Sequence, residues 1–302
     1  MPTSRRLHRI APAILALLLA LAPPVAAQRA QVAPEAATGR IEKPLQIARS
    51  YMVSAANPLA VDAGVEMLKA GGSAVDAAIA TQLVLNLVEP QSSGLGGGAY
   101  LLHWNARSQE IAAYDGRETA PAAATADRFL RDGRPMPFET AINSGLSIGV
   151  PGTPRLLEAA HRAHGKLPWQ RLFEPAIRLA EDGFPVSPRL HQLLQQVGPQ
   201  NFEATARAYF FDAAGRPHAP GYRLANPAFA ATLKTIRGGG ADAFHAGPLA
   251  QSIVAAVAAA PNHPGDMTAA DVAGYRVETR PPACVEYQIG RASCRERVYV
   301  LV

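Results

Sequence analysis

A glycine-rich loop at residues 94–98 is the first stretch whose composition could serve chemistry. It reads GLGGG and contains Gly94, Gly96, Gly97 and Gly98. Such loops cradle phosphates when they follow a strand and open a helix, because the helix N-terminus then faces the anion. Here the expected helix precedes the loop and the expected strand follows it, and no lysine followed by serine or threonine comes directly behind it. The order therefore favours a loop whose missing side chains let a neighbouring backbone or a substrate come close.

Arg117 lies in a second candidate segment, residues 115–121 (DGRETAP), directly after an expected strand. An arginine in this position is held firmly at a sheet edge, and its planar guanidinium can bind a carboxylate through two parallel hydrogen bonds. A solvated turn arginine is the simpler interpretation. From the residues alone, both interpretations stay open.

The remaining reactive side chains form no recognisable site. His161 and His164 are three positions apart on an expected helix and could share a metal ion, but no acidic residue completes a metal motif of the HExxH kind, so a solvated surface pair is favoured. Serine, histidine and aspartate all occur, which leaves a catalytic triad open by counting alone. We therefore expect no metal and no cofactor, and no catalytic residue can be named from the residues alone.

Local signals indicate the elements that would position these residues. Asn57 followed by Pro58 predicts a helix over 59–70, and Ser73 predicts the start of another over 74–87. Strands over 99–104 and 110–114 form a predicted hairpin that ends just before Arg117. Further helices are expected over 153–164, 169–181, 188–196, 228–237 and 249–259. Thr268 begins a capping box, and residues 274–287 predict a strand or hairpin. This order predicts a mixed α and β fold with an antiparallel sheet rather than a doubly wound parallel one.

Residues 1–27 have the pattern of a secretory signal peptide. Arg5, Arg6 and Arg9 precede an apolar run over 13–22, and small residues end at position 27. The run is shorter than the roughly 20 residues of a membrane-spanning helix, so we expect no stable membrane anchor. An uncleaved anchor and twin-arginine export are the alternatives. We expect a periplasmic or secreted protein in which residues 28–47 form a mobile leader.

The charge balance argues against a nucleic-acid partner. The 29 lysines and arginines exceed the 24 acidic residues by five, but that excess lies in residues 1–27 and 289–302. The body between them is close to neutral and lacks the electrostatic footprint of a nucleic-acid-binding surface. Only two cysteines are present, Cys284 and Cys294, so there is no disulfide framework, although a bridge between the two stays open.

Several ordered motifs together resemble the γ-glutamyltranspeptidase (glutathione hydrolase) family. The resemblance covers about residues 48–288, which we take as the large-subunit part of a γ-glutamyltranspeptidase-like domain. Its motifs lie at residues 52–53, 57–60, 71–78, 91–98, 115–121, 150–153, 179–184 and 267–271.

This resemblance implies an N-terminal-nucleophile hydrolase, a four-layer αββα sandwich made as one precursor that cuts itself into two subunits. In the family, a threonine at the start of the small subunit is the nucleophile, and its own amine is the base. It cleaves γ-glutamyl amides such as glutathione through an acyl-enzyme and passes the glutamyl group to water or an amino acid. The resemblance assigns the substrate's α-carboxylate to Arg117. Many relatives have phenylalanine before this arginine, where this chain has Gly116.

The end of the chain departs from the family. No Thr-Thr pair and no TxHxS pattern occurs, so the nucleophilic threonine and the small subunit lie beyond this chain. Residues 289–302 differ in composition from the body, and we interpret them as a foreign tail. We expect this polypeptide alone to be inactive and poorly soluble. A cephalosporin-type acylase of the same fold and a catalytically dead γ-glutamyl-binding module are the alternatives for the complete protein.

Overall fold

The computed structural model describes residues 44–287 and 290–293 of the 302-residue chain. The expected signal peptide at 1–27 and Cys294 lie outside the described residues, so the predictions on export and on a Cys284–Cys294 bridge stay predictions. Within the described part, no helix is long and apolar enough to cross a membrane.

Two capped helices begin the described fold. Helix α2 (Pro58–Lys69) starts at Asn57, whose side chain accepts a hydrogen bond of 3.1 Å from the Leu59 backbone N–H. Helix α3 (Ala74–Val88) starts at Ser73, which forms a capping box with Asp76. Both helices are confirmed at nearly the predicted bounds, because side-chain caps are local signals that can be recognised in the sequence.

A three-stranded antiparallel sheet carries the candidate arginine. Strand β1 (Ala99–Asn105) and strand β2 (Glu110–Gly116) form the predicted hairpin, and β7 (Glu278–Arg280) pairs with the other side of β2. Strand β2 is the central strand of this sheet, and Arg117 is the first residue after its C-terminal end. Arg117 therefore follows the hairpin strand directly, as predicted, and β7, which pairs with the other side of β2, comes from a segment far along the sequence.

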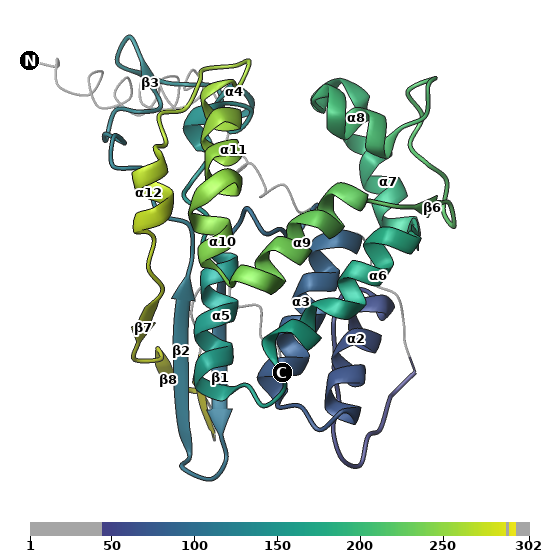
Figure 1. Ribbon diagram of the computed structural model, residues 1–302. Coiled ribbons are helices and arrows are strands. Elements are labelled where there is room, and N and C mark those ends of the chain that lie inside the picture. Colours follow the sequence, from purple (N-terminus) through teal and green to yellow (C-terminus); the bar gives the residue numbers. More distant parts are fainter. Residues whose placement is uncertain (1–43, 288–289, 294–302) are drawn as a thin grey trace, which may run out of the picture. The chain divides into compact units, whose positions relative to one another are not determined.

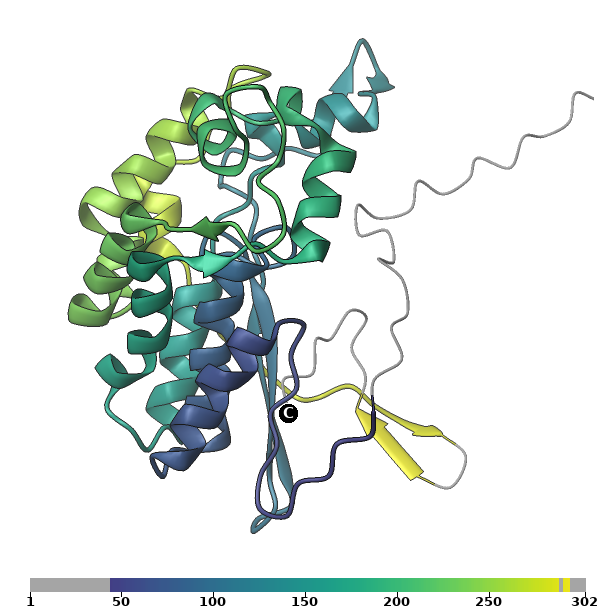
Figure 2. The ribbon, with the colours of Figure 1, turned by 90° about the vertical axis from the view of Figure 1, so that its right-hand side faces the viewer.

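A helical layer packs on the hairpin. Helix α5 (Thr153–His164) contacts β1 and β2, and α3 packs against α5, α2 and α6 (Glu174–Asp182). In Figure 2 the sheet is seen nearly edge-on, and α2, α3 and α5 lie on one side of it. Helix α9 (Pro227–Gly239) packs against α6 and crosses in front of the helical layer in Figure 1. Helix α3 is buried on almost all sides and forms the centre of the core, as its apolar composition predicts.

The predicted helix over 169–181 divides into two elements. A 3-10 turn, η3 (Trp169–Phe173), precedes α6. Pro175 lies near the junction and has no N–H to donate to the preceding turn, which interrupts a continuous α-helix. The predicted helices over 188–196, 228–237 and 249–259 are confirmed as α7 (Pro188–Val197), α9 and α11 (Gly247–Ala258).

The other described elements are short, and several have no strong signal in the sequence. They are β3 (Leu130–Arg131), β4 (Arg134–Pro135), α4 (Phe138–Ile142), η2 (Gly145–Ser147), β5 (Phe184–Pro185), η4 (Pro199–Asn201), α8 (Ala204–Phe210), β6 (Arg223–Leu224) and α10 (Asp242–His245).

The C-terminal part begins with α12 (Ala269–Gly274), which has the predicted capping box at Thr268. The predicted strand or hairpin over 274–287 becomes two strands with different partners. Strand β7 joins the main sheet, whereas β8 (Cys284–Tyr287) pairs with β9 (Gly290–Ser293).

Asp76 fastens α3 to the segment after α5. Its side chain is fully buried, and its Oδ2 accepts hydrogen bonds from the backbone N–H groups of Ser73 (2.7 Å), Lys166 (2.9 Å) and Leu167 (3.1 Å). One carboxylate therefore satisfies a donor three residues before it and another 90 residues after it in the chain. Buried donors without partners are costly, which makes this residue a structural requirement.

We expect Asp76→Ala to lower the free energy of unfolding by about 3 kcal/mol, because it leaves three backbone donors without their acceptor. The comparison variant is Asp271→Ala, which removes the partly exposed capping-box carboxylate of α12. This carboxylate also accepts a hydrogen bond of 2.9 Å from the Ala122 N–H, but water can replace the carboxylate there, so the expected cost is about 1 kcal/mol. Urea unfolding followed by circular dichroism measures both. Equal costs for the two variants would contradict the role given to Asp76.

Candidate functional site

Arg117 has a backbone held by hydrogen bonds and an exposed side chain. Its N–H donates to Asp115 Oδ1 at 3.2 Å, and its carbonyl oxygen accepts a hydrogen bond of 2.7 Å from Tyr275 Oη. The side chain is 55% exposed, and its Nε lies 3.2 Å from Glu118 Oε2. Arg117 is thus anchored through its backbone while more than half of its side-chain surface is exposed, an arrangement suited to capture of an anionic group.

The glycine loop lies directly against this backbone. A Cβ at Gly98 would come within 2.6 Å of Glu118 N and 2.7 Å of Arg117 Cα. Real Cβ atoms do not approach backbone so closely, so this position requires glycine. By contrast, a Cβ at Gly96 would have no heavy atom of a described residue within 4 Å, and one at Gly94 would be 3.9 Å from Gly96 N. The close approach proposed for the loop therefore belongs to its last glycine.

The same loop caps helix α5. The Gly97 carbonyl oxygen accepts hydrogen bonds from the N–H groups of Gly152 (2.9 Å) and Thr153 (3.1 Å) at the start of that helix. These N–H groups have no partner within their own helix. Because a backbone carbonyl already binds them, this helix end is not free to bind a phosphate, which agrees with the order of elements that disfavoured a nucleotide site.

Leu156 fills the space beside Arg117. A Cβ at Gly116 would lie 2.6 Å from Leu156 Cβ, on the first turns of α5. The departure from the family at this position is thus accommodated by a leucine that occupies the side-chain volume next to the arginine. A large residue at position 116 would displace α5 from the sheet.

Buried polar contacts anchor the start of the loop. Glu89 is 2% exposed, and it binds Asn57 Nδ2 through Oε1 at 3.1 Å and Arg189 Nη1 through Oε2 at 2.5 Å. A few residues further on, Ser93 Oγ donates to Asn86 Oδ1 at 2.5 Å. These contacts connect the loop to α2, α3 and α7, so three helices determine where the glycines lie.

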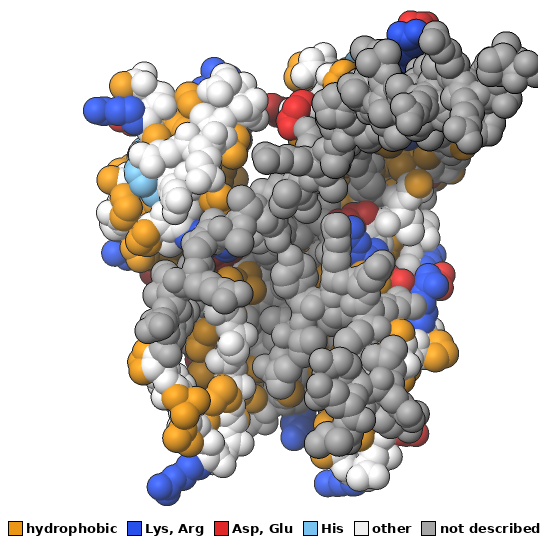
Figure 3. Space-filling model, turned by 180° about the vertical axis from the view of Figure 1, so that it is seen from behind, with side chains coloured by type: hydrophobic (Ala, Val, Ile, Leu, Met, Phe, Trp, Pro, Cys, Tyr) orange, Lys and Arg blue, Asp and Glu red, His pale blue; other side chains and the backbone are white. Residues whose placement is uncertain are grey.

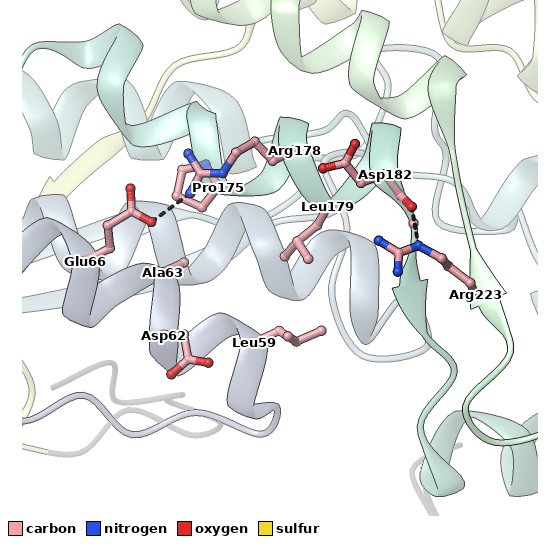
Figure 4. Close-up of a pocket in the computed structure, with 10 residues that line it drawn as sticks. Leu59, Asp62, Ala63, Glu66, Pro175, Arg178, Leu179, Asp182 and Arg223 are labelled. Carbon is pink, nitrogen blue, oxygen red and sulfur yellow. Dashed lines mark hydrogen bonds and ion pairs between the residues drawn. The ribbon is translucent and has the colours of Figure 1, made fainter.

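A pocket of about 280 Å³ lies between α2 and α6, away from Arg117. Figure 4 shows that both arginines of its lining already have partners. Arg178 binds Glu66 Oε2 at 2.8 Å, and Arg223 donates to the Asp182 carbonyl oxygen at 2.6 Å. Its lining contains no serine, threonine, cysteine or histidine that could act as a nucleophile or imidazole base. We therefore do not place the chemistry there.

The two helical histidines do not form the expected surface pair. His161 Nε2 lies 2.8 Å from the Leu167 carbonyl oxygen, whereas His164 Nε2 lies 2.7 Å from Tyr114 Oη. The His164 ring also stacks on His103 with 3.8 Å between ring centroids. That expectation is wrong because α5 turns both rings toward packed neighbours. Among the described residues, no group of three or more His, Cys, Asp or Glu could hold a metal ion.

The expectation that the chain contains no Gly-x-Ser-x-Gly motif is wrong, because residues 145–149 read GLSIG and have the spacing of a nucleophile elbow. Ser147 lies in the 3-10 turn η2, and its Oγ donates to the carbonyl oxygens of Ser144 (2.9 Å) and Ile142 (3.0 Å). An elbow requires a sharp turn from a strand into a helix, which η2 does not provide. This serine has a structural role in its own turn.

The electrostatics around Arg117 keep a nearby phenol neutral. Burial, together with the carboxylates of Asp115, Glu118 and Glu278, raises the pKa of Tyr275 to about 12. Its hydroxyl is therefore a hydrogen-bond donor throughout the range of ordinary working pH.

On the face shown in Figure 3, basic side chains are scattered, several of them beside acidic ones.

The chain matches known proteins over most of its length. The family model described as Gamma-glutamyltranspeptidase matches residues 60–299, and the match thus runs past residue 288. The chain is 36% identical to the glutathione hydrolase proenzyme of Bacillus subtilis (strain 168) over 247 residues, which cover 82% of this chain and 41% of that protein. It is also 36% identical to human glutathione hydrolase 7, covering 74% of this chain and 32% of that protein. The chain therefore spans about two fifths or less of these relatives.

Solved structures give the same result. The gamma-glutamyltranspeptidase of Helicobacter pylori aligns with a TM-score of 0.78 and 29% identity, covering 84% of this chain and 72% of that one. The cephalosporin acylase of Bacillus halodurans aligns with a TM-score of 0.66 and 28% identity, covering 84% of this chain and 48% of that one. The expected fold class, an α and β N-terminal-nucleophile hydrolase architecture, agrees with these neighbours.

We expect Gly98→Ala to destabilise the protein by about 1–3 kcal/mol, because the new methyl group collides with the backbone on both sides of Arg117. Gly96→Ala is the matched control in the same loop, where the added Cβ meets open space. Thermal unfolding of both variants is the measurement. A control variant as unstable as Gly98→Ala would show that loop flexibility, and not close contact, is what matters.

Stability should also fall in mild acid. Burial lowers the pKa of His103 and of His164 below the ordinary value of 6.5. Repulsion from the positive charge of His103 lowers the pKa of His164 further. The folded state favours the neutral rings, so their contribution is complete above about pH 6.5 and is lost as pH falls through the lowered pKa values. The urea midpoint should drop between pH 7 and pH 5, and His103→Gln should reduce that drop. An unchanged pH dependence in this variant would contradict the assignment.

Proposed function

Because the chain belongs to the gamma-glutamyltranspeptidase family, we propose that it is the large-subunit part of a proenzyme that cleaves γ-glutamyl amides. The proposed reaction transfers the glutamyl group to water or to an amino acid. Glutathione-like compounds are the proposed donors, because the named bacterial and human relatives are glutathione hydrolases.

The geometry of Arg117 is the observation that supports this proposal. Arg117 follows the end of a central strand, more than half of its side-chain surface is exposed, and its backbone is held by Asp115 and Tyr275. A planar fork held in this way matches the two oxygens of a carboxylate. We therefore assign the α-carboxylate of the donor to Arg117, with the glycine loop forming the adjacent wall.

The proposed nucleophile is a threonine supplied by the small-subunit part of the same precursor. Its hydroxyl attacks the γ-amide carbonyl and its proton passes to the threonine's own amine. The C–N bond then breaks, the leaving amine takes the proton, and an acyl ester remains until water or an amino acid releases the glutamyl group. This scheme needs no metal and no cofactor.

The sheet offers a place for that second subunit. Side chains alternate along β1, so Trp104 lies on the face opposite to Leu101, which packs in the core. Trp104 is 53% exposed. We propose that strands of the small subunit cover this face, and that the signal-like residues 1–27 direct the precursor out of the cytoplasm.

An acylase is the second candidate, since the cephalosporin acylase of Bacillus halodurans covers as much of this chain as the transpeptidase of Helicobacter pylori does. Both activities would use an arginine that binds a substrate carboxylate. Rates of hydrolysis of a γ-glutamyl anilide and of a glutaryl anilide by the complete protein separate the two, because only the γ-glutamyl group carries an α-amine beside the carboxylate.

In the complete protein, we expect Arg117→Ala to lower kcat/KM for a γ-glutamyl anilide on the order of 100-fold or more, mainly through KM. Arg117→Lys retains the charge but loses the fork, and should recover only part of the loss. Steady-state kinetics measure all three proteins.

Arg107→Ala is the matched control, because this arginine lies in the turn at the opposite end of the same hairpin. It should leave the kinetics unchanged. If Arg117→Ala hydrolysed the anilide as efficiently as the control, the carboxylate would be bound elsewhere and the proposed function of Arg117 would be wrong.

A further inference from the structure

We infer that Tyr275 is a positioning residue for Arg117 and determines how tightly the site binds the donor's carboxylate. This inference rests on the proposed function and adds to it a residue that follows α12, 158 positions from the arginine. Tyr275 does not need to touch the substrate, because it acts through the arginine's main chain.

The hydroxyl of Tyr275 is enclosed at the site. It donates a hydrogen bond of 2.7 Å to the Arg117 carbonyl oxygen, and the residue is 4% exposed. It also packs so closely on Gly152 that a Cβ there would collide with the phenol oxygen, and would lie 2.6 Å from the ring carbon Cζ. The phenol therefore connects the peptide after Arg117 to the loop that begins α5.

His245 supports the phenol ring from behind. The two rings are stacked, with centroids 5.7 Å apart and planes inclined by 22°. The fully buried His245 places Nε2 2.9 Å from the Pro151 carbonyl oxygen and Nδ1 3.0 Å from that of Ala241. The ring that orients Arg117 is thus fixed by a side chain that also contacts the α5 loop.

The consequence for binding follows from the shape of a guanidinium. Two parallel hydrogen bonds to a carboxylate require the fork to have one orientation. Arg117 has a long and largely exposed side chain, so its starting point is set by its own backbone. Without the phenol hydroxyl, the carbonyl of Arg117 loses a buried hydrogen-bond partner and the peptide can rotate. The guanidinium then samples more orientations, and its affinity for the carboxylate falls.

The first test is Tyr275→Phe in the complete, processed protein, with a γ-glutamyl anilide as the donor. Phenylalanine keeps the ring that packs on His245 and removes only the hydroxyl. We expect KM to rise about five-fold, as for loss of one hydrogen bond, while kcat stays within about two-fold. Thermal unfolding verifies that the variant is folded.

Tyr114→Phe is the matched control. Tyr114 is also a buried tyrosine of this sheet region, but its hydroxyl lies 2.7 Å from His164 Nε2 and away from Arg117. This variant loses the same atom at a similar cost in packing. Its KM should equal that of the unmodified protein.

A double-mutant cycle separates positioning from general weakening. In an Arg117→Ala background, Tyr275→Phe should leave KM unchanged, because the fork that it orients is gone. The preference for the donor over its α-carboxamide analogue should fall in Tyr275→Phe and stay intact in Tyr114→Phe.

An unchanged KM in Tyr275→Phe, or the same five-fold rise in the Arg117→Ala background, overturns the inference. If instead the unmodified protein fails to hydrolyse the donor, or Arg117→Ala alone leaves KM unchanged, the proposed function fails. The two failures are therefore distinguishable.

Discussion

The site depends on one backbone oxygen, the carbonyl of Gly97. It accepts hydrogen bonds from the N–H groups of Gly152 and Thr153 at the start of α5. No side chain caps this helix, so the Gly97 carbonyl serves as its N-terminal cap. That helix in turn packs on the hairpin that ends at Arg117. A loop, a helix and a strand are thereby held in one place through main-chain contacts, which tolerate little movement because polar backbone groups in the interior need their partners.

Charge at the site is arranged to hold the arginine without neutralising it fully. Glu118 pairs with Nε of Arg117, whose side chain is still more than half exposed. Asp115 binds the backbone N–H of Arg117 and, at 3.0 Å, the side chain of Arg280. The acidic groups thus fix the arginine's main chain and one side of its fork. The outward side is the part that a substrate carboxylate would meet.

The sequence could predict what is local. The helix caps at Asn57, Ser73 and Thr268 were evident because a cap and its helix are adjacent, and the hairpin was evident from two short apolar runs. Contacts between distant segments could not be predicted. By sequence Gly96 and Gly98 are alike, and only the approach of the Arg117 backbone separates them. The pairing of β7 with β2 and the hydrogen bond from Tyr275 to Arg117 likewise depend on segments more than 150 residues apart.

The most direct test is a crystal structure of the complete, processed protein with L-glutamate bound. The account predicts that both oxygens of the α-carboxylate lie within hydrogen-bond distance of the terminal nitrogens of Arg117, with the Tyr275 hydroxyl still bound to the Arg117 carbonyl oxygen. A structure in which other side chains hold the carboxylate, while Arg117 remains solvated, would contradict the account.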